Sequence, residues 1–86
     1  MGEPTTEEVR AIVSLMLLSV SFHQETDGRW LADVAELPGV MAYGATQREA
    51  LTAVEVLALR VIADQIEHGE LTPGALAVSF QLPAAA

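Results

Sequence analysis

The sequence contains no cysteine and no lysine, and each absence excludes a group of functions. Without cysteine there are no disulfide bonds, no thiol nucleophile and no cysteine-ligated zinc site. The basic residues are four arginines against twelve acidic residues, so the formal net charge is −8. Such a surface repels the phosphates of nucleic acids and of anionic lipids, and it suits a basic protein partner. The lack of cysteine also fits a reducing compartment, and we predict a cytoplasmic protein.

The sequence also lacks a hydrophobic run long enough to cross a bilayer. The apolar stretch Ala11–Val20, which Ser14 and Ser19 interrupt, is far shorter than the roughly 20 residues that a transmembrane helix needs. Its length would suit the core of a signal peptide. However, three glutamates and a single arginine precede it, and a signal peptide needs a positively charged leader. We therefore expect this segment to belong to the fold, and we expect no membrane association.

What is present fits one small folded domain. A chain of 86 residues buries only about 60% of the surface that it exposes when unfolded. Half of the residues are hydrophobic, so the composition is not that of a disordered chain. Because such a core is marginal, association between copies would add stability. We expect a homo-oligomer, either a dimer or a tetramer.

We place the domain at residues 16–83, between an N-terminal extension at 1–15 and a tail at 84–86. In the extension, Thr5 and Glu8 have the Thr-x-x-Glu spacing of a capping box, and apolar residues follow at helical spacing. This pattern predicts a short helix that ends near Leu15.

The residues after the extension predict strands joined by a tight turn. From Leu18 to His23 apolar and polar side chains alternate, which is typical of a strand with one buried face. Asp27 and Gly28 form an Asp-Gly turn, a strong hairpin signal. A second strand is therefore expected at Arg29–Ala35.

A second turn leads to a third strand. Pro38 and Gly39 fit a type II turn, because proline fixes φ at the first central residue and glycine takes the positive φ of the second. The third strand is expected at Val40–Tyr43 and ends at Gly44. Three strands with such short connections predict an antiparallel meander.

The clearest element is a long helix at Gln47–His68. Thr46 is its predicted N-cap, Glu49 completes a second capping box, and Gly69 stands where a C-terminal glycine belongs. Its apolar surface is wider than the stripe of about 100° that covering one sheet requires. The excess predicts a second packing surface, against another subunit or against the N-terminal segment.

A last strand is predicted at Ala77–Leu82, which completes the order β-β-β-α-β. The fold class is thus α+β: an antiparallel meander, a long helix and a fourth strand, preceded by the short N-terminal helix. One helix covers one face of the sheet. The other face is expected to be small and polar, and to be solvated or to meet another chain; it carries Ser19, Ser21, Ser79 and Gln81.

The order of these motifs resembles the HicB-like antitoxin family. That family characteristically has an acidic-Gly turn, a Pro-Glu-Leu-Pro-Gly-like segment and a Gly-Asp-Thr-x-x-Glu-Ala helix start. The matching segments here are Asp27-Gly28-Arg29-Trp30, Glu36-Leu37-Pro38-Gly39-Val40, Gly44-Ala45-Thr46 and Glu49-Ala50-Leu51. The resemblance covers roughly Leu17 to Leu82. Ala35 and Ala45 depart from it, since the family often has proline at the first position and an acidic residue at the second.

The resemblance implies a partial ribonuclease-H-like β-β-β-α-β fold and a function in a toxin–antitoxin system. Proteins of this family neutralise HicA-type toxins, which are small basic ribonucleases, by covering the toxin's active surface. Many also repress their own operon through a C-terminal DNA-binding domain. Here the chain stops three residues after Pro83. We therefore expect direct DNA binding to be absent.

The residues do not favour catalysis, a metal site or a cofactor site. A two-metal nuclease needs several carboxylates that converge on one point, and the strand interiors supply only Asp33. His23 and His68 are distant in sequence and have no companion at ligand spacing, so we predict no metal site. The turn and cap glycines form no phosphate-binding loop, and we predict no cofactor.

We therefore predict a non-catalytic antitoxin that occludes a small basic ribonuclease toxin; the alternative is a homo-oligomeric scaffold or binding domain without a toxin partner. Trp30 shares a strand face with Ala32 and Val34, which favours a core position, although tryptophan is also enriched at interfaces. The candidate partner surface consists of acidic residues, which would speed association, and one tyrosine: Glu25, Asp27, Asp33, Glu36 and Tyr43.

Overall fold

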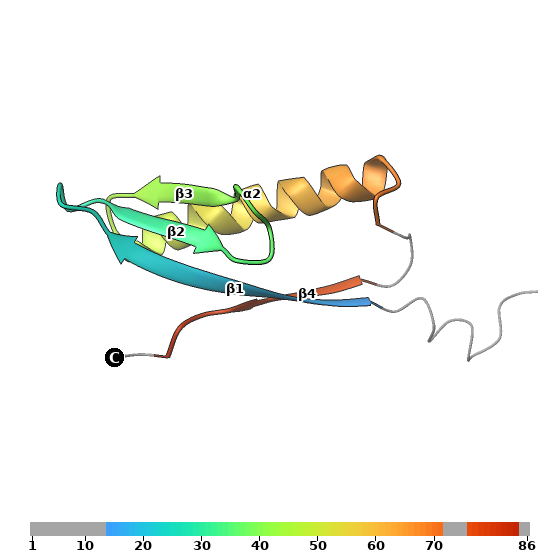
Figure 1. Ribbon diagram of the computed structural model, residues 1–86, viewed down its shortest axis with the longest axis horizontal. Helices are drawn as coiled ribbons and strands as arrows, with labels where there is room; N and C mark the ends of the chain where they lie inside the picture. Colours follow the sequence, from blue (N-terminus) through green and yellow to red (C-terminus); the bar gives the residue numbers. More distant parts are fainter. Residues whose placement is uncertain (1–13, 72–75, 85–86) are drawn as a thin grey trace, which may run out of the picture.

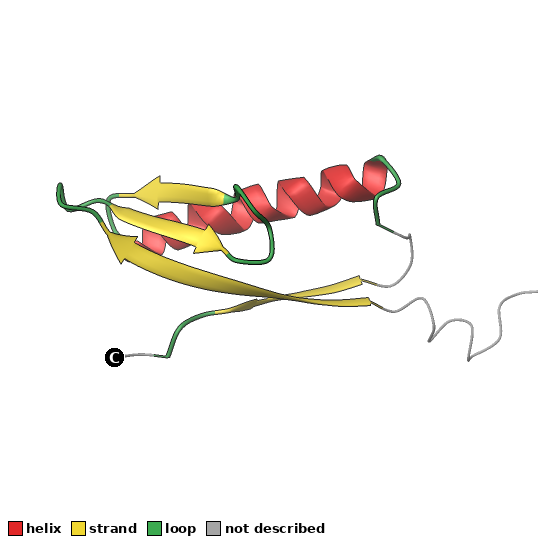
Figure 2. Ribbon diagram, viewed as in Figure 1, coloured by secondary structure: helices red, strands yellow, loops and turns green. Residues whose placement is uncertain are grey.

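A computed structural model describes residues 14–71 and 76–84, which form one sheet and one helix. Their order is β-β-β-α-β, as predicted, and the α+β class is confirmed (Figures 1 and 2). The elements are β1 (Ser14–Gln24), β2 (Trp30–Val34), β3 (Met41–Gly44), α2 (Gln47–Glu67) and β4 (Leu76–Gln81).

The four strands form one mixed sheet in the order β3-β2-β1-β4. β1 pairs antiparallel with β2, and β2 with β3, so the predicted meander is present. β4 lies parallel to β1, because α2 carries the chain back along the sheet before β4 begins (Figure 1). The two partners share β1: its residues Val20–Gln24 pair with β2 and its residues Ser14–Ser19 pair with β4.

The predicted N-terminal helix is wrong at its end, because Leu15 belongs to β1 and pairs with Ala77 of β4. The rest of that helix lies outside the described residues. The run Leu15–Leu18 is apolar without a period, and such a run fits a helix and a buried strand equally well. Pairing with β4, which is distant in sequence, makes it a strand. The other predicted bounds of β2, β3, α2 and β4 differ by one residue at most at each end.

Both predicted turns are present. In the first, the Gly28 N–H donates to the Glu25 carbonyl at 3.0 Å, and Gly28 has a φ of +91°. In the second, the Val40 N–H donates to the Leu37 carbonyl at 3.0 Å, and Gly39 has a φ of +85°. A type II turn needs this positive φ at its third residue, which explains the glycine.

The ends of α2 are capped as the sequence predicts. Thr46 Oγ1 accepts a hydrogen bond of 3.1 Å from the Glu49 N–H, and the Glu49 carboxylate accepts one of 3.0 Å from the Ala45 N–H. One backbone donor of the first turn, the Glu49 N–H, and one donor just before the helix, the Ala45 N–H, are thereby satisfied. At the other end His68 is the C-cap, and Gly69 follows with a φ of +74°.

The core lies between α2 and one face of the sheet, mainly over β2 and β3. Small and β-branched residues of α2 let the helix approach the strands closely. The half-buried Trp30 packs against this core, as predicted. The buried residues are Leu18, Val20, Ala32, Val34, Leu37, Val40, Ala50, Val54, Ala58 and Ile62.

Candidate partner-binding surface

The face of the sheet that points away from α2 carries no covering element among the described residues. Side chains alternate between the two faces of a strand. Since Leu18 and Val20 are buried beneath α2, their neighbours on β1 point to the opposite side. We call this side the open face; the register places on it Leu15, Leu17, Ser19, Ser21, His23, Leu31, Asp33, Met41, Tyr43, Ala77, Ser79 and Gln81.

The open face is more apolar than the sequence indicated. The predicted small polar residues of β1 and β4 do lie there. However, β3 adds Met41 and Tyr43, which are 48% and 49% exposed. The half-buried Leu31 of β2 lies opposite Tyr43. Large apolar side chains in a group on an exposed sheet face are typical of a surface that binds another molecule.

At the hairpin end of this face, an arginine joins a carboxylate to the tyrosine. Arg29 Nε donates to Asp27 Oδ2 at 2.7 Å, and the Arg29 N–H donates to Asp27 Oδ1 at 3.0 Å. The backbone bond, followed by the side-chain bond, holds the pKa of Asp27 below its ordinary value. The Arg29 guanidinium also lies 4.4 Å from the centre of the Tyr43 ring, within cation–π range. The tyrosine ring is thus held in place while half of it stays exposed.

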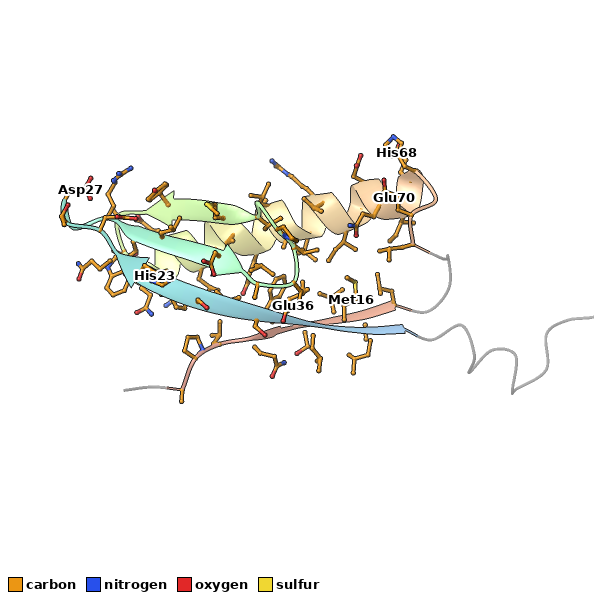
Figure 3. The ribbon with its side chains drawn as sticks, in the orientation of Figure 1. Met16, His23, Asp27, Glu36, His68 and Glu70 are labelled. Carbon is orange, nitrogen blue, oxygen red and sulfur yellow. The ribbon has the colours of Figure 1, made fainter. Side chains whose placement is uncertain are left out.

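Glu36 holds β1 at the point where β2 ends. Its two carboxylate oxygens accept hydrogen bonds from the Ser19 N–H at 2.6 Å and from Ser19 Oγ at 2.7 Å. The backbone bond and then the hydroxyl bond lower the pKa of Glu36. The carboxylate takes the place that a longer β2 would occupy, because the Ser19 carbonyl accepts from the Ala35 N–H on the same side. Figure 3 shows Glu36 beside β1.

Asp33 lies in the middle of the open face. It pairs across the sheet with Ser21 on one side and with Met41 on the other. Its carboxylate is 4.0 Å from His23 Nε2, and its side chain is about one-third exposed. Among the described strand residues, no other one on this face carries a carboxylate. Asp33 therefore has no second strand carboxylate beside it of the kind that two-metal chemistry needs.

The structure brings most of the predicted partner residues together. Asp33 and Tyr43 lie on the open face, Glu36 reaches it through Ser19, and Asp27 reaches it through Arg29. The fifth predicted residue is Glu25, which lies half-buried in the β1–β2 turn, with backbone hydrogen bonds as its described contacts. Met41 and Leu31 were missed, because the cross-strand register that places Leu31 opposite Tyr43 and Met41 opposite Asp33 is not visible in a single strand.

A group of possible metal ligands at the end of α2 was also missed. Asp64, Glu67 and His68 offer ligand atoms within 4.8 Å of one another, and all three residues are exposed. His68 Nδ1 lies 3.2 Å from Asp64 Oδ1 and 2.9 Å from the Asp64 carbonyl oxygen. The spacing i, i+3, i+4 was the signal in the sequence. Exposed acidic groups at a helix end are common, so the group by itself indicates no function.

On the helix side, an open groove lies between the start of α2 and the residues that follow β4. Phe22 and Trp30 of the sheet, Leu51 and Arg48 of α2, and Leu82 line it. Trp30 therefore contacts the core and also borders this groove. At the opposite end of the molecule lie His68 and Glu70 (Figure 3).

Comparisons of the chain with family models, with curated proteins and with solved structures gave no match. Within residues 14–71 and 76–84, no helix combines the length and the apolar character that crossing a membrane requires.

Proposed function

We propose that this protein is a non-catalytic binding module of the HicB-like antitoxin type, which binds and occludes a small basic ribonuclease toxin. The observation that carries the proposal is the open face: half-exposed Met41 and Tyr43 lie beside Asp33 on a sheet face that no described element covers. The resemblance of the sequence motifs to that family and the β-β-β-α-β order support it.

The mechanism is steric occlusion assisted by charge. The net charge of −8 attracts a basic protein and speeds the encounter. Once the partner is in place, burial of Met41, Tyr43 and Leu31 supplies the favourable free energy, because apolar area leaves water. The carboxylates of Asp33 and Glu36 then meet basic groups of the toxin's RNA-binding surface, which is closed to RNA as a result.

The test is to mix the protein with a small basic protein encoded beside it and to measure binding by calorimetry as salt increases. We expect a complex that weakens with salt, and a loss of affinity of about tenfold or more in Met41→Arg. Leu82→Arg is the matched control, since Leu82 is 52% exposed but borders the groove on the helix side. No complex even at low salt, or equal loss in both variants, contradicts the proposal.

Asp33 separates binding from catalysis. In the binding module, Asp33→Asn slows association with the basic partner, because one steering charge is lost. In a nuclease, Asp33→Ala would instead abolish cleavage of RNA that depends on a divalent metal. An RNA cleavage assay with Mg²⁺ and with Mn²⁺ distinguishes the two, and cleavage that disappears in this variant would make the protein an enzyme.

A second candidate function is a homo-oligomeric scaffold without a toxin partner. The observation that favours it is the exposure of Val56, Leu59 and Ile66 on the outer side of α2. Light scattering tests it directly: the scaffold requires an oligomer in the absence of any other protein, and a strictly monomeric protein removes this candidate.

A further inference from the structure

The outer side of α2 carries a row of exposed apolar side chains. The inner side of the helix packs on the sheet through Ala50, Val54, Ala58 and Ile62. On the opposite side Val56, Leu59 and Ile66 are 43%, 48% and 40% exposed, and the exposed Ala63 lies between the last two. The sheet of the same chain cannot cover this row, because the helix itself stands between them (Figure 1).

The spacing of this row is that of a coiled-coil seam. Val56, Leu59, Ala63 and Ile66 are separated by three, four and three residues, which corresponds to positions a, d, a and d of a heptad. A mean spacing of 3.5 keeps such side chains aligned toward a second helix of the same kind. Within parallel coiled coils, a β-branched residue at a with leucine at d, as in Val56 and Leu59, favours two helices over three or four.

The charges beside the row indicate what the second helix is. In this heptad Glu55 occupies position g and Arg60 position e. Between two parallel helices, a g residue faces the e residue five positions further along the other helix. Glu55 of one copy would therefore face Arg60 of a second copy, twice in a two-fold dimer. Among the described residues, neither side chain takes part in an ion pair within its own chain.

The opposite orientation does not have this complementarity. If the helices ran antiparallel with the same apolar layers, Val56 would meet Ile66 of the other copy and Leu59 would meet Ala63. The two Arg60 side chains would then lie close to each other near the two-fold axis, where like charges repel. The charge pattern thus selects the parallel arrangement of two identical helices.

We infer that the outer face of α2 is a self-association surface, on which a second copy of this chain packs with its α2 parallel to the first. The helix is already ordered by its own sheet, so pairing carries little of the cost of helix formation. The seam covers only about three turns and is smaller than a standard interface, so the dimer forms in a concentration-dependent way. The surface lies on the side of the molecule away from the open face, and the inference does not depend on a toxin partner.

Sedimentation equilibrium from about 1 μM to about 1 mM tests the association, because that range covers the free energies of small interfaces. We expect dimers in the unmodified protein and an affinity lower by about tenfold or more in Leu59→Lys. Leu17→Lys is the matched control: Leu17 is 52% exposed but lies on the open face. It should leave the dimer unchanged, and circular dichroism should show that both variants are folded.

Several outcomes overturn the inference. A monomer at every concentration does so. The inference is also overturned if the protein is monomeric and Leu59→Lys lowers its thermal stability, because another part of the same chain would then cover the row. Dissociation by Leu17→Lys but not by Leu59→Lys would place the interface on the open face instead.

Cysteine cross-linking tests the parallel register. Because the sequence has no native cysteine, an introduced cysteine is the only thiol that can form a disulfide bond. In a parallel pair Ala63 faces Ala63 of the second copy, so Ala63→Cys chains should form a covalent dimer under mild oxidation. The reaction should fail when Leu59→Lys is added. A charge test accompanies it: Glu55→Arg should weaken the dimer, and Glu55→Arg with Arg60→Glu should restore it. A dimer that neither cross-links nor responds to these charges contradicts the parallel arrangement.

Discussion

Gly44 lies against the first turn of α2, and replacing it with alanine should destabilise the fold. It is the last residue of β3 and pairs with Trp30. A Cβ atom added there would collide with the Ala50 backbone nitrogen and would lie 2.8 Å from the carbonyl carbon and from the Cβ of Glu49. Non-bonded carbon atoms normally stay about 3.5–4.0 Å apart. The first turn of α2 must therefore move outward by about 1 Å.

The direction of the change in stability distinguishes a collision at Gly44 from the usual effect of replacing glycine with alanine. The φ of Gly44 is not in the left-handed region, so alanine brings no backbone strain. In open space, a change from glycine to alanine stabilises a protein by about 0.4–1 kcal/mol through the unfolded state. Here the collision with backbone atoms reverses the sign, and forced overpacking costs about 1–3 kcal/mol. For a domain of this size each kcal/mol lowers Tm by about 4–8 °C.

Urea denaturation followed by circular dichroism measures the loss, and the emission of Trp30, the single tryptophan, reports the displacement of the neighbouring helix. Gly28→Ala is the comparison. Its φ of +91° brings a strain of about 1–2 kcal/mol, but the added Cβ meets nothing within 4 Å. It should lower stability without altering the emission. A higher urea midpoint in Gly44→Ala would refute the close approach of α2 to β3.

Three further changes test other contacts. Thr46→Ala removes the cap of α2 and should cost about 1 kcal/mol in urea denaturation. Val54→Ala leaves a cavity at a fully buried position and should cost about 2 kcal/mol in the same assay, without affecting dimerisation. The lowered pKa of Glu36 gives a stabilisation that is complete above the pKa of its unfolded carboxyl and is lost as the pH falls through the lower folded pKa. The urea midpoint of the unmodified protein should therefore fall between about pH 7 and pH 2, and Glu36→Gln should make this fall smaller. Glu70→Gln is the control, because the Glu70 carboxylate has no described hydrogen bond. This variant should show the same fall as the unmodified protein.

The parts of the fold that the sequence predicted are those with local causes. The turns at Gly28 and Gly39 need a positive φ, and the cap at Thr46 needs a hydroxyl three residues before a donor; each signal lies within a few residues. For that reason the hairpin, the second turn and both ends of α2 were predicted correctly.

The features of the fold that could not be predicted from the sequence depend on contacts between residues that are distant in the chain. Residues Ser14–Ser19 belong to β1 because β4, some sixty residues later, supplies a parallel partner. No local pattern in an apolar run specifies that pairing. Likewise, the open face looked small and polar when only Ser19, Ser21, Ser79 and Gln81 were assigned to it. Met41 and Tyr43 joined it only through the register between β2 and β3.

The two proposed surfaces follow from one property of a two-layer domain. A single helix covers a single face of the sheet, so the other face of the sheet and the outer side of the helix both meet solvent. Large apolar side chains that are grouped on an exposed surface are typical of binding sites. Here Met41 and Tyr43 are half exposed on one side, and Leu59 on the other, in a chain otherwise rich in acidic residues.

Since the surfaces lie on opposite sides, a second copy and a basic partner need not compete. Leu59→Lys should then bind the partner in a 1:1 complex, where the unmodified dimer binds two partners. Met41→Arg should lose the partner and keep the dimer. Loss of both interactions in either variant would mean that the two surfaces are coupled through the sheet or are one surface. The proposal of two independent binding surfaces would then be wrong.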